Sequence, residues 1–304
     1  MRLPTGLGIG LIMARALITN GASKIYILGR RLEVLEAAAR ENPGLIAIQC
    51  DVTSKVSLQA AVDKVTADSG FINLLIANSG VVGPPNRWNL DLSVSEQRQV
   101  LFTDNPMEDF TEAMGVNVTG ALFTMTAFLE LLDAGNKNAL NGGFGGPGLG
   151  ICGAVPAVQR QVIVTSSLAA FSRMSMSAPA YACSKAAAMH ITKQASSMLG
   201  KYGIRANSLS PGRECCYHYS CFYVAREAYI GKVFPSELAA SMIGNRKPEL
   251  EPHGDPMFIP ARRFGGEQEM AGTILYLASR AGSYCNGLVL LIDGGRASHM
   301  TSSY

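Results

Sequence analysis

The fold is decided by the stretch VIVTSSL at residues 162–168, in which four β-branched residues precede two serines. A continuous apolar run of this kind is typical of a strand that is buried on both faces of a parallel sheet. The stretches KIYILGR at 24–30 and LLIANSG at 74–80 follow the same pattern. Helical patterns at 116–132 and 181–199 alternate with these strands. The chain therefore predicts an α/β fold built from βαβ units with right-handed crossovers.

Chemistry is indicated by the stretch AYACSKA at residues 180–186, which places Tyr181 and Lys185 four residues apart in an Ala-rich segment. In a helix the two side chains share one face about one turn apart. A nearby cation favours the phenolate and lowers a tyrosine pKa by roughly 1 to 3 units, which suits proton transfer at a carbonyl. Taken alone, the pair can also arise by chance. Upstream, Ser167 is expected at the carboxyl end of its strand, where open α/β sheets bind ligands.

In the order of these motifs the chain resembles the short-chain dehydrogenase/reductase family. The resemblance extends over nearly the whole length and implies one domain, residues 1–304, with a Rossmann-type doubly wound parallel sheet and helices on both faces. It rests on GLGIG at 6–10, DV at 51–52, NSG at 78–80, VNVTG at 116–120, SPG at 210–212, IDGG at 292–295 and the single residues Ser167, Tyr181 and Lys185.

The resemblance implies NAD(P)-dependent hydride transfer with a small-molecule carbonyl or alcohol, and four catalytic residues. Tyr181 would donate the proton, Ser167 would hydrogen-bond the substrate oxygen, and Lys185 would bind the nicotinamide ribose and lower the tyrosine pKa. Asn117 would hold a water that links Lys185 to solvent. Without the family, Asn117 would be interpreted as an asparagine that satisfies helix backbone. Ser166 is a rival for the serine role, and the family pattern favours Ser167.

The cofactor is predicted to be NADP(H) in preference to NAD(H). Glycines at residues 6–10 let the backbone approach a pyrophosphate at the start of a helix near Gly10. Arg30 and Arg31 follow the next strand where an NAD-binding chain places an acid, and guanidinium groups suit the extra phosphate. Solvated charges at a helix start, and a post-strand cap for Asp51, are the alternatives. The full implied set is Gly6, Gly8, Ile9, Gly10, Arg30, Arg31, Asp51, Val52, Asn78, Gly80, Tyr181, Lys185, Pro211 and Gly212.

A narrower resemblance is to fungal reductases similar to rhamnolipid-type 3-oxoacyl-carrier-protein reductases. It is suggested by FPSEL at 234–238 and PARRFG at 260–265. It implies a ketone or 3-oxoacyl-type carbonyl as the substrate.

The amino terminus departs from the family. The family opens with a strand that forms the centre of its sheet and ends in Thr-Gly, whereas Leu3-Pro4 stands in that place here. Losing a central strand leaves neighbouring strand edges unpaired. We therefore expect a sheet that lacks its usual first strand, from a misassigned or truncated start, with weakened folding and cofactor affinity. A cofactor-binding pseudoenzyme or regulatory sensor is the alternative function.

Residues 213–233 form an anomalous insertion, with three of the seven cysteines and four of the ten tyrosines. They would serve as an enlarged substrate lid if they belong to the protein. We favour a retained intron in the gene model. Codons for Arg213-Glu214-Cys215 can contain the donor GTGAGT, codons for Lys232-Val233 can contain an acceptor AG, and their removal restores an unbroken family loop.

A glycine-rich stretch at 135–153, with eight glycines among nineteen residues, predicts a mobile surface loop. A net charge of +3 with scattered basic residues gives no reason to expect nucleic acid. Seven irregularly spaced cysteines indicate reduced thiols, with no zinc pattern and no metal. No signal peptide or bilayer-length apolar helix is expected, and the enzyme should be cytoplasmic.

A homodimer or homotetramer is expected, because the family builds its interface from the helices that carry Asn117 and Tyr181. Their apolar content exceeds what one contact with the sheet requires, although thick-sided core helices are the alternative. The apolar residues concerned are Leu122, Phe123, Met125, Phe128, Leu129, Ala186, Ala187, Met189, Ile191 and Met198.

Overall fold

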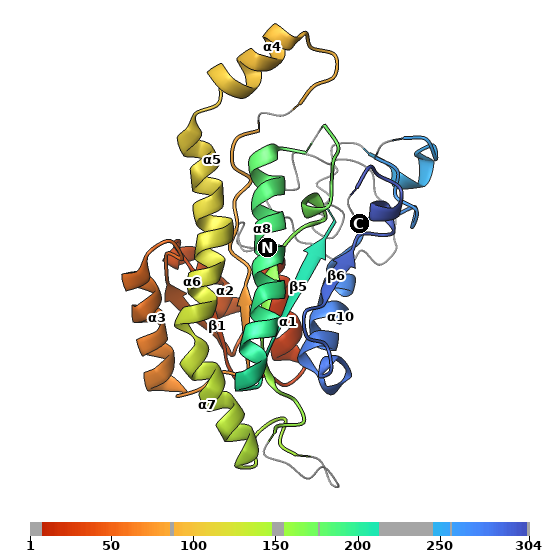
Figure 1. Cartoon of the computed structure of the whole chain (residues 1–304). Coiled ribbons are helices and arrows are strands. Elements are labelled where there is room, and N and C mark those ends of the chain that lie inside the picture. The colour runs from red at the N-terminus through yellow and green to blue at the C-terminus, as the bar shows by residue number, and fades with distance from the viewer. Residues whose placement is uncertain are drawn as a thin grey trace.

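The computed structural model describes residues 8–85, 88–147, 155–175, 177–212, 246–255 and 257–302. Helices and strands alternate along most of the described chain (Figure 1). The strands are β1 Ile25–Gly29, β2 Leu45–Gln49, β3 Leu74–Ala77, β4 Arg160–Thr165, β5 Ile204–Pro211 and β6 Val289–Ile292. The α-helices are α1 Gly8–Thr19, α2 Leu32–Glu41, α3 Lys55–Asp68, α4 Val94–Arg98, α5 Met107–Met114, α6 Ala121–Ala127, α7 Leu129–Leu140, α8 Pro179–Met198 and α10 Glu267–Ala278.

The strands pair in parallel, in two separate groups. β1 pairs with β2, and the second group has the order β3-β4-β5-β6. The three strands expected at 24–30, 74–80 and 162–168 are present as β1, β3 and β4, so the α/β class predicted from the apolar runs is confirmed.

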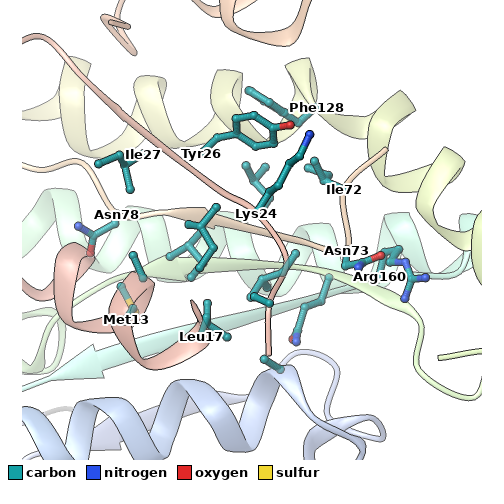
Figure 2. A pocket seen from close by; sticks show the side chains of 18 of the residues that line it. Met13, Leu17, Lys24, Tyr26, Ile27, Ile72, Asn73, Asn78, Phe128 and Arg160 are labelled. Atoms are coloured by element: carbon teal, nitrogen blue, oxygen red, sulfur yellow. The ribbon is translucent and has the colours of Figure 1, made fainter. Parts of the chain in front are cut away.

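A gap separates the two groups of strands. Within the described residues no strand lies between β1 and β3, and each pairs with a strand on one side only. Among the described residues the position between β1 and β3 thus has no strand, and this is where a strand expected at the centre of the sheet would belong. The residues that line this space include 24–28 and 73–79 (Figure 2).

Helices cover both faces of the sheet, as a doubly wound fold requires. On one face α1 packs against α10 over β4 and β5, through Met13, Ile163 and Met270 among others. On the other face α6 and α8 pack over the same strands, through Met125 and Ala188. The predicted layers are thus confirmed.

The helices α5, α6 and α7 follow one another closely and form one long helical segment with two interruptions. α5 continues through a π-helical turn at Gly115–Gly120 into α6, and α7 follows after Phe128. The predicted helix at 116–132 is therefore part of a longer one. Figure 1 shows α4 and the upper end of α5 projecting beyond the sheet layers.

The loop predicted for 135–153 is wrong at its start, because residues 135–140 are the last residues of α7. Gly135 is buried against the side chain of Arg160, where a Cβ atom would overlap the main chain of Ile72. A close tertiary contact, and not loop flexibility, thus accounts for this glycine.

Some expectations fall outside the described residues. They concern Leu3-Pro4, Gly6, residues 148–153 of the glycine-rich stretch, the whole of 213–233 and the FPSEL stretch at 234–238. Among the described helices none is individually long and apolar enough to cross a membrane. One pair bent by 44°, Met107–Ala127 with Leu129–Leu140, meets the requirement by length and composition only.

Candidate active site at the carboxyl edge of the sheet

Several of the predicted site residues gather at one edge of the sheet because they follow the ends of parallel strands. Arg30 follows β1, Asn78 follows β3, Ser167 follows β4 and Gly212 follows β5. Parallel strands end at the same edge, so residues far apart in sequence meet there.

Lys185 is anchored at this edge by β4. Its Nζ donates a hydrogen bond of 2.9 Å to the main-chain oxygen of Thr165, the last residue of the strand. The Nζ also lies 5.8 Å from the centre of the Tyr181 ring, one turn earlier on α8. The side chain is 3% exposed, and this burial lowers the pKa of Lys185 to about 8. The helical spacing predicted for the pair is confirmed.

Asn117 is fixed by three hydrogen bonds of 2.8 Å from within the π-helical turn. Its Oδ1 accepts from the main-chain N–H of Val81, while its Nδ2 donates to the Val81 oxygen and to the Ser184 hydroxyl. A Cβ atom on Gly80 would lie 3.0 Å from Asn117 Oδ1 and 3.1 Å from Lys185 Nζ. The loop after β3 therefore packs tightly over the two side chains and brings them together.

The two serines after β4 face different surroundings. The Ser166 hydroxyl is buried and donates 2.7 Å to the main-chain oxygen of Lys185 in α8. Ser167 is half-buried, and its Oγ accepts from the Ala169 N–H at 3.2 Å, which caps the 3₁₀ turn Leu168–Ala170. Ser166 thus joins strand to helix, whereas Ser167 is the more exposed of the two serines.

The start of α1 meets the end of β3. Gly8 has φ of 47° and begins the helix, two residues before the predicted start. A Cβ atom on Gly10 would lie 2.7 Å from Asn78 Nδ2, so only glycine allows this approach without movement. Asn78 Oδ1 in turn accepts from the Thr165 hydroxyl at 3.0 Å, which ties it to β4.

Val52 follows β2 and packs against the π-helical turn that carries Asn117. A Cβ atom on Gly120 would come within 2.9 Å of a Val52 methyl group, so the π-helical turn also packs closely here.

The two arginines and Asp51 lie beside the ends of β1 and β2. Both arginines are exposed, and Arg31 precedes the first residue of α2. The Thr53 hydroxyl and N–H both donate to Asp51, and these bonds, aided by the Arg30 charge, lower the pKa of the Asp51 carboxyl. Asp51 therefore accepts hydrogen bonds within the turn after β2, whereas Ser54 caps α3, and the adenine role of Asp51 stays a prediction.

The last two predicted cofactor residues, Pro211 and Gly212, lie where β5 pairs with β6. Pro211 ends β5 in register with Ile292, and the Gly212 N–H donates 2.9 Å to the Ile292 oxygen. No group of three His, Cys, Asp or Glu side chains suited to a metal is found within the described ranges.

Two residues of the site were missed from the sequence. Ser184 links Asn117 to α8 through its hydroxyl, which also donates 2.8 Å to the Tyr181 main-chain oxygen. Thr165 holds both Lys185 and Asn78. A signal for Ser184 was available, since it is a hydroxyl next to the lysine in an Ala-rich helix.

A family model described as short chain dehydrogenase matches residues 5–140, and one described as enoyl-(acyl carrier protein) reductase matches residues 152–213. The short-chain dehydrogenase/reductase SAT3 of Stachybotrys chartarum is 58% identical over 96% of this chain and 100% of its own. The chain belongs to the short-chain dehydrogenase/reductase family, whose enzymes act on CH–OH or C=O groups with NAD(P).

Two further proteins show how far the likeness extends. Short-chain dehydrogenase/reductase VdtF of Byssochlamys spectabilis is 38% identical over 98% of this chain and 92% of its own. The structure described as Pseudomonas aeruginosa RhlG/NADP active-site complex has a TM-score of 0.67 at 24% identity, covering 95% of this chain and 92% of that one. At this identity the likeness concerns the fold, and the narrower resemblance to rhamnolipid-type reductases stays a prediction.

Proposed function

We propose that this protein is an NADP(H)-dependent oxidoreductase that reduces a ketone or 3-oxoacyl-type carbonyl, or oxidises the corresponding alcohol. The observation that carries the proposal is the buried Lys185 held 5.8 Å from the Tyr181 ring, at the strand edge that also carries Ser167. A buried ammonium beside a phenol favours the phenolate, which makes the tyrosine a usable acid and base near neutral pH.

The residues at this edge fit a dinucleotide. Gly10 has no side chain and approaches Asn78 closely at the start of α1. A pyrophosphate could therefore come close to the main chain there and accept hydrogen bonds from its N–H groups. Arg30 and Arg31 are exposed beside the end of β1 and would hold a ribose phosphate, with Asp51 and Val52 nearer the adenine. Gly6, Gly8, Ile9, Asn78, Gly80, Pro211 and Gly212 would line the rest of the site, and NADP(H), when bound, supplies or accepts the hydride.

The protein's own part in the reaction is positioning and proton transfer. Ser167 would orient the carbonyl oxygen toward the Tyr181 hydroxyl, which gives its proton as the oxygen gains charge. Lys185 would hold the ribose and favour the phenolate that remains. Asn117 would hold a water that returns the proton through Lys185 from solvent.

Replacing Tyr181 tests this assignment. Tyr181→Phe keeps the ring and should retain NADPH binding, while carbonyl reduction falls by roughly 10² to 10⁴, the usual contribution of a positioned acid. Tyr202→Phe, at an exposed tyrosine after α8, is the matched control and should keep full activity. Wild-type turnover by the Tyr181 variant would refute the role.

Coenzyme choice is tested at the two arginines. The double change of Arg30 and Arg31 to Ala should weaken NADPH much more than NADH, because only NADPH loses charge-assisted hydrogen bonds to a phosphate. Equal weakening of both coenzymes, measured by fluorescence titration, would make the arginines general structural residues.

A cofactor-binding sensor without turnover is a second candidate, favoured by the gap between β1 and β3 beside Gly10. NADPH titration combined with a carbonyl-substrate screen separates the two. Binding without turnover of any substrate would support the sensor.

We also propose a homodimer or homotetramer in the cytoplasm. Leu122 on α6 and Met198 at the end of α8 are exposed and support an interface, whereas Met125 and Phe128 are buried within the single chain and are withdrawn from it. The described cysteines, Cys50, Cys183 and Cys285, are free thiols, in keeping with a reducing compartment. Light scattering after size exclusion tests the assembly, and a stable active monomer at micromolar concentration would refute it.

A further inference from the structure

The chain after β6 turns around a buried carboxylate. The two oxygens of Asp293 accept hydrogen bonds from the main-chain N–H groups of Gly295 at 3.0 Å and Ala297 at 2.7 Å. Gly294 and Gly295 have φ of 63° and 86°, a region of backbone conformation that favours glycine. The tail that follows, residues 296–302, therefore leaves β6 in a defined direction at the carboxyl edge of the sheet (Figure 1), and we name it the strap.

The strap is held by aromatic packing and by a hydrogen bond of its own. The centre of the His299 ring lies 4.8 Å from that of Phe258 and 4.6 Å from that of His253. Within the strap the Ser302 hydroxyl donates a hydrogen bond of 3.0 Å to the main-chain oxygen of Ala297. These contacts fix the strap against the segment that carries Phe258 and His253.

The far end of the strap meets the segment that follows Ser167 and leads into α8. Ser302 forms an antiparallel bridge with Ser172, and the main-chain N–H of Arg173 donates 2.9 Å to the Thr301 oxygen. Both contacts reach this segment between the strand end that carries Ser167 and the first turn of α8. The strap therefore ties the end of the chain to the connection between β4 and α8.

A series of hydrogen bonds leads from the strap to the Ser167 hydroxyl. Next to Arg173, the Ser172 N–H donates 3.2 Å to the main-chain oxygen of Ala169. The Ala169 N–H in turn donates 3.2 Å to Ser167 Oγ. A displacement of residues 172 and 173 would therefore move the 3₁₀ turn that supplies the donor to this hydroxyl. Since a shift of about 1 Å in a positioned group can cost a large factor in rate, the strap bears on catalysis.

We propose that the strap positions Ser167 for the reaction, so that residues 299–302 are positioning residues of the active site. This inference rests on the proposed function, in which Ser167 hydrogen-bonds the substrate oxygen. In this role the strap acts through the 3₁₀ turn Leu168–Ala170. Release of the strap should therefore lower kcat for carbonyl reduction while the affinity for NADPH stays the same. A purely structural contact would change the stability of the fold and leave kcat of the folded protein unchanged.

Two substitutions at one position test the bond from Arg173 to the strap. Arg173→Pro removes the N–H that donates to Thr301, whereas Arg173→Ala removes the same exposed side chain and keeps the N–H. The proline variant should have a kcat about tenfold to 100-fold below that of the alanine variant, with the same Kd for NADPH by fluorescence titration. Equal kcat values in the two variants would overturn the proposal, and so would a loss of NADPH affinity that matches the loss of kcat.

A second pair loosens the strap without altering the segment after Ser167. His299→Ala removes the ring that packs on Phe258 and His253, and His299→Phe keeps an aromatic ring in its place. The kcat should fall by about threefold or more in the alanine variant and return toward the wild-type value in the phenylalanine variant. An unchanged kcat in the alanine variant would contradict the positioning role, even if the Arg173→Pro variant failed to fold.

Hydrogen exchange follows the strap without reference to catalysis. In His299→Ala the amides of residues 168–173 should exchange about tenfold faster than in wild type, while those of β1 keep their rates. Unchanged exchange in residues 168–173 would overturn the strap even in an active enzyme. Absence of carbonyl turnover in the wild-type protein would instead refute the proposed function and, with it, the catalytic purpose of the strap, whereas faster exchange in His299→Ala would still establish the contact.

Discussion

Replacing Lys185 by methionine should remove a rise in stability that the wild-type protein shows above about pH 8. The lysine titrates at its usual 10.5 in the unfolded chain, whereas burial lowers its pKa to about 8 in the fold. Between these values the unfolded state binds a proton that the folded state has released. Stability therefore increases with pH across this window, and below pH 8 the full cost of burying the charge is present.

The magnitude follows from the two pKa values. A difference from 10.5 to about 8 is about 2.5 units, which at about 1.4 kcal/mol per unit corresponds to about 3 kcal/mol. At pH 7 the methionine variant, which buries no charge, should be the more stable of the two. Its advantage over wild type should fall by about 3 kcal/mol as the pH rises to 10.5.

Urea unfolding of both proteins at several values between pH 7 and 10.5 measures this difference directly. Lys193→Met is the matched control for the loss of a lysine, because Lys193 is exposed on the same helix α8. If wild type and the Lys185 variant gave parallel curves across this range, the buried state of Lys185 would be refuted.

Two further changes probe the contacts around Asn117. Gly80→Ala places a methyl group 3.0 to 3.1 Å from Asn117 and Lys185 and should lower the unfolding free energy by about 1 to 3 kcal/mol. Gly115→Ala is the control, because the new methyl group would meet no atom within 4 Å outside its own stretch of helix, and it should not lower the unfolding free energy. Unchanged stability in the Gly80 variant would contradict the tight packing. Ser184→Ala removes a buried partner of the Asn117 amide and should lower the unfolding free energy by about 1 to 3 kcal/mol. Ser196→Ala removes an exposed bond of the same helical type and should have little effect, so equal losses would argue against a special role for Ser184.

Much of the fold was predictable because parallel strands buried on both faces leave an unmistakable apolar run. The stretch at residues 162–168 gave β4 and the position of Ser167 at its end. The relation of Tyr181 to Lys185 was equally predictable, since it depends only on helical spacing. Both features depend on residues that are close together in the sequence, so a single sequence is enough to predict them.

The rest depends on contacts between distant residues. The glycines at 135–153 predict a loop by composition, yet Gly135 belongs to α7 because the Arg160 side chain and the main chain of Ile72 occupy the space beside it. Likewise, the bonds of Asn117 to Val81 and Ser184 join segments separated by 36 and 67 residues. No local pattern specifies such pairs, and the apolar content of a helix does not distinguish the buried Met125 from the exposed Leu122.

The π-helical turn at Gly115–Gly120 sets how two stretches of helix are phased around a common axis. An α-helix advances about 100° per residue, and a π-type turn accommodates one extra residue without breaking the helix. Deleting a single codon here would restore regular winding, yet α5 and the projecting α4 would keep nearly the same rotation relative to α6, because the wide turn already absorbs the extra residue. Natural variation can therefore add or remove this one residue in a single in-frame step, while α6 keeps its place on the sheet and the projecting segment keeps its direction.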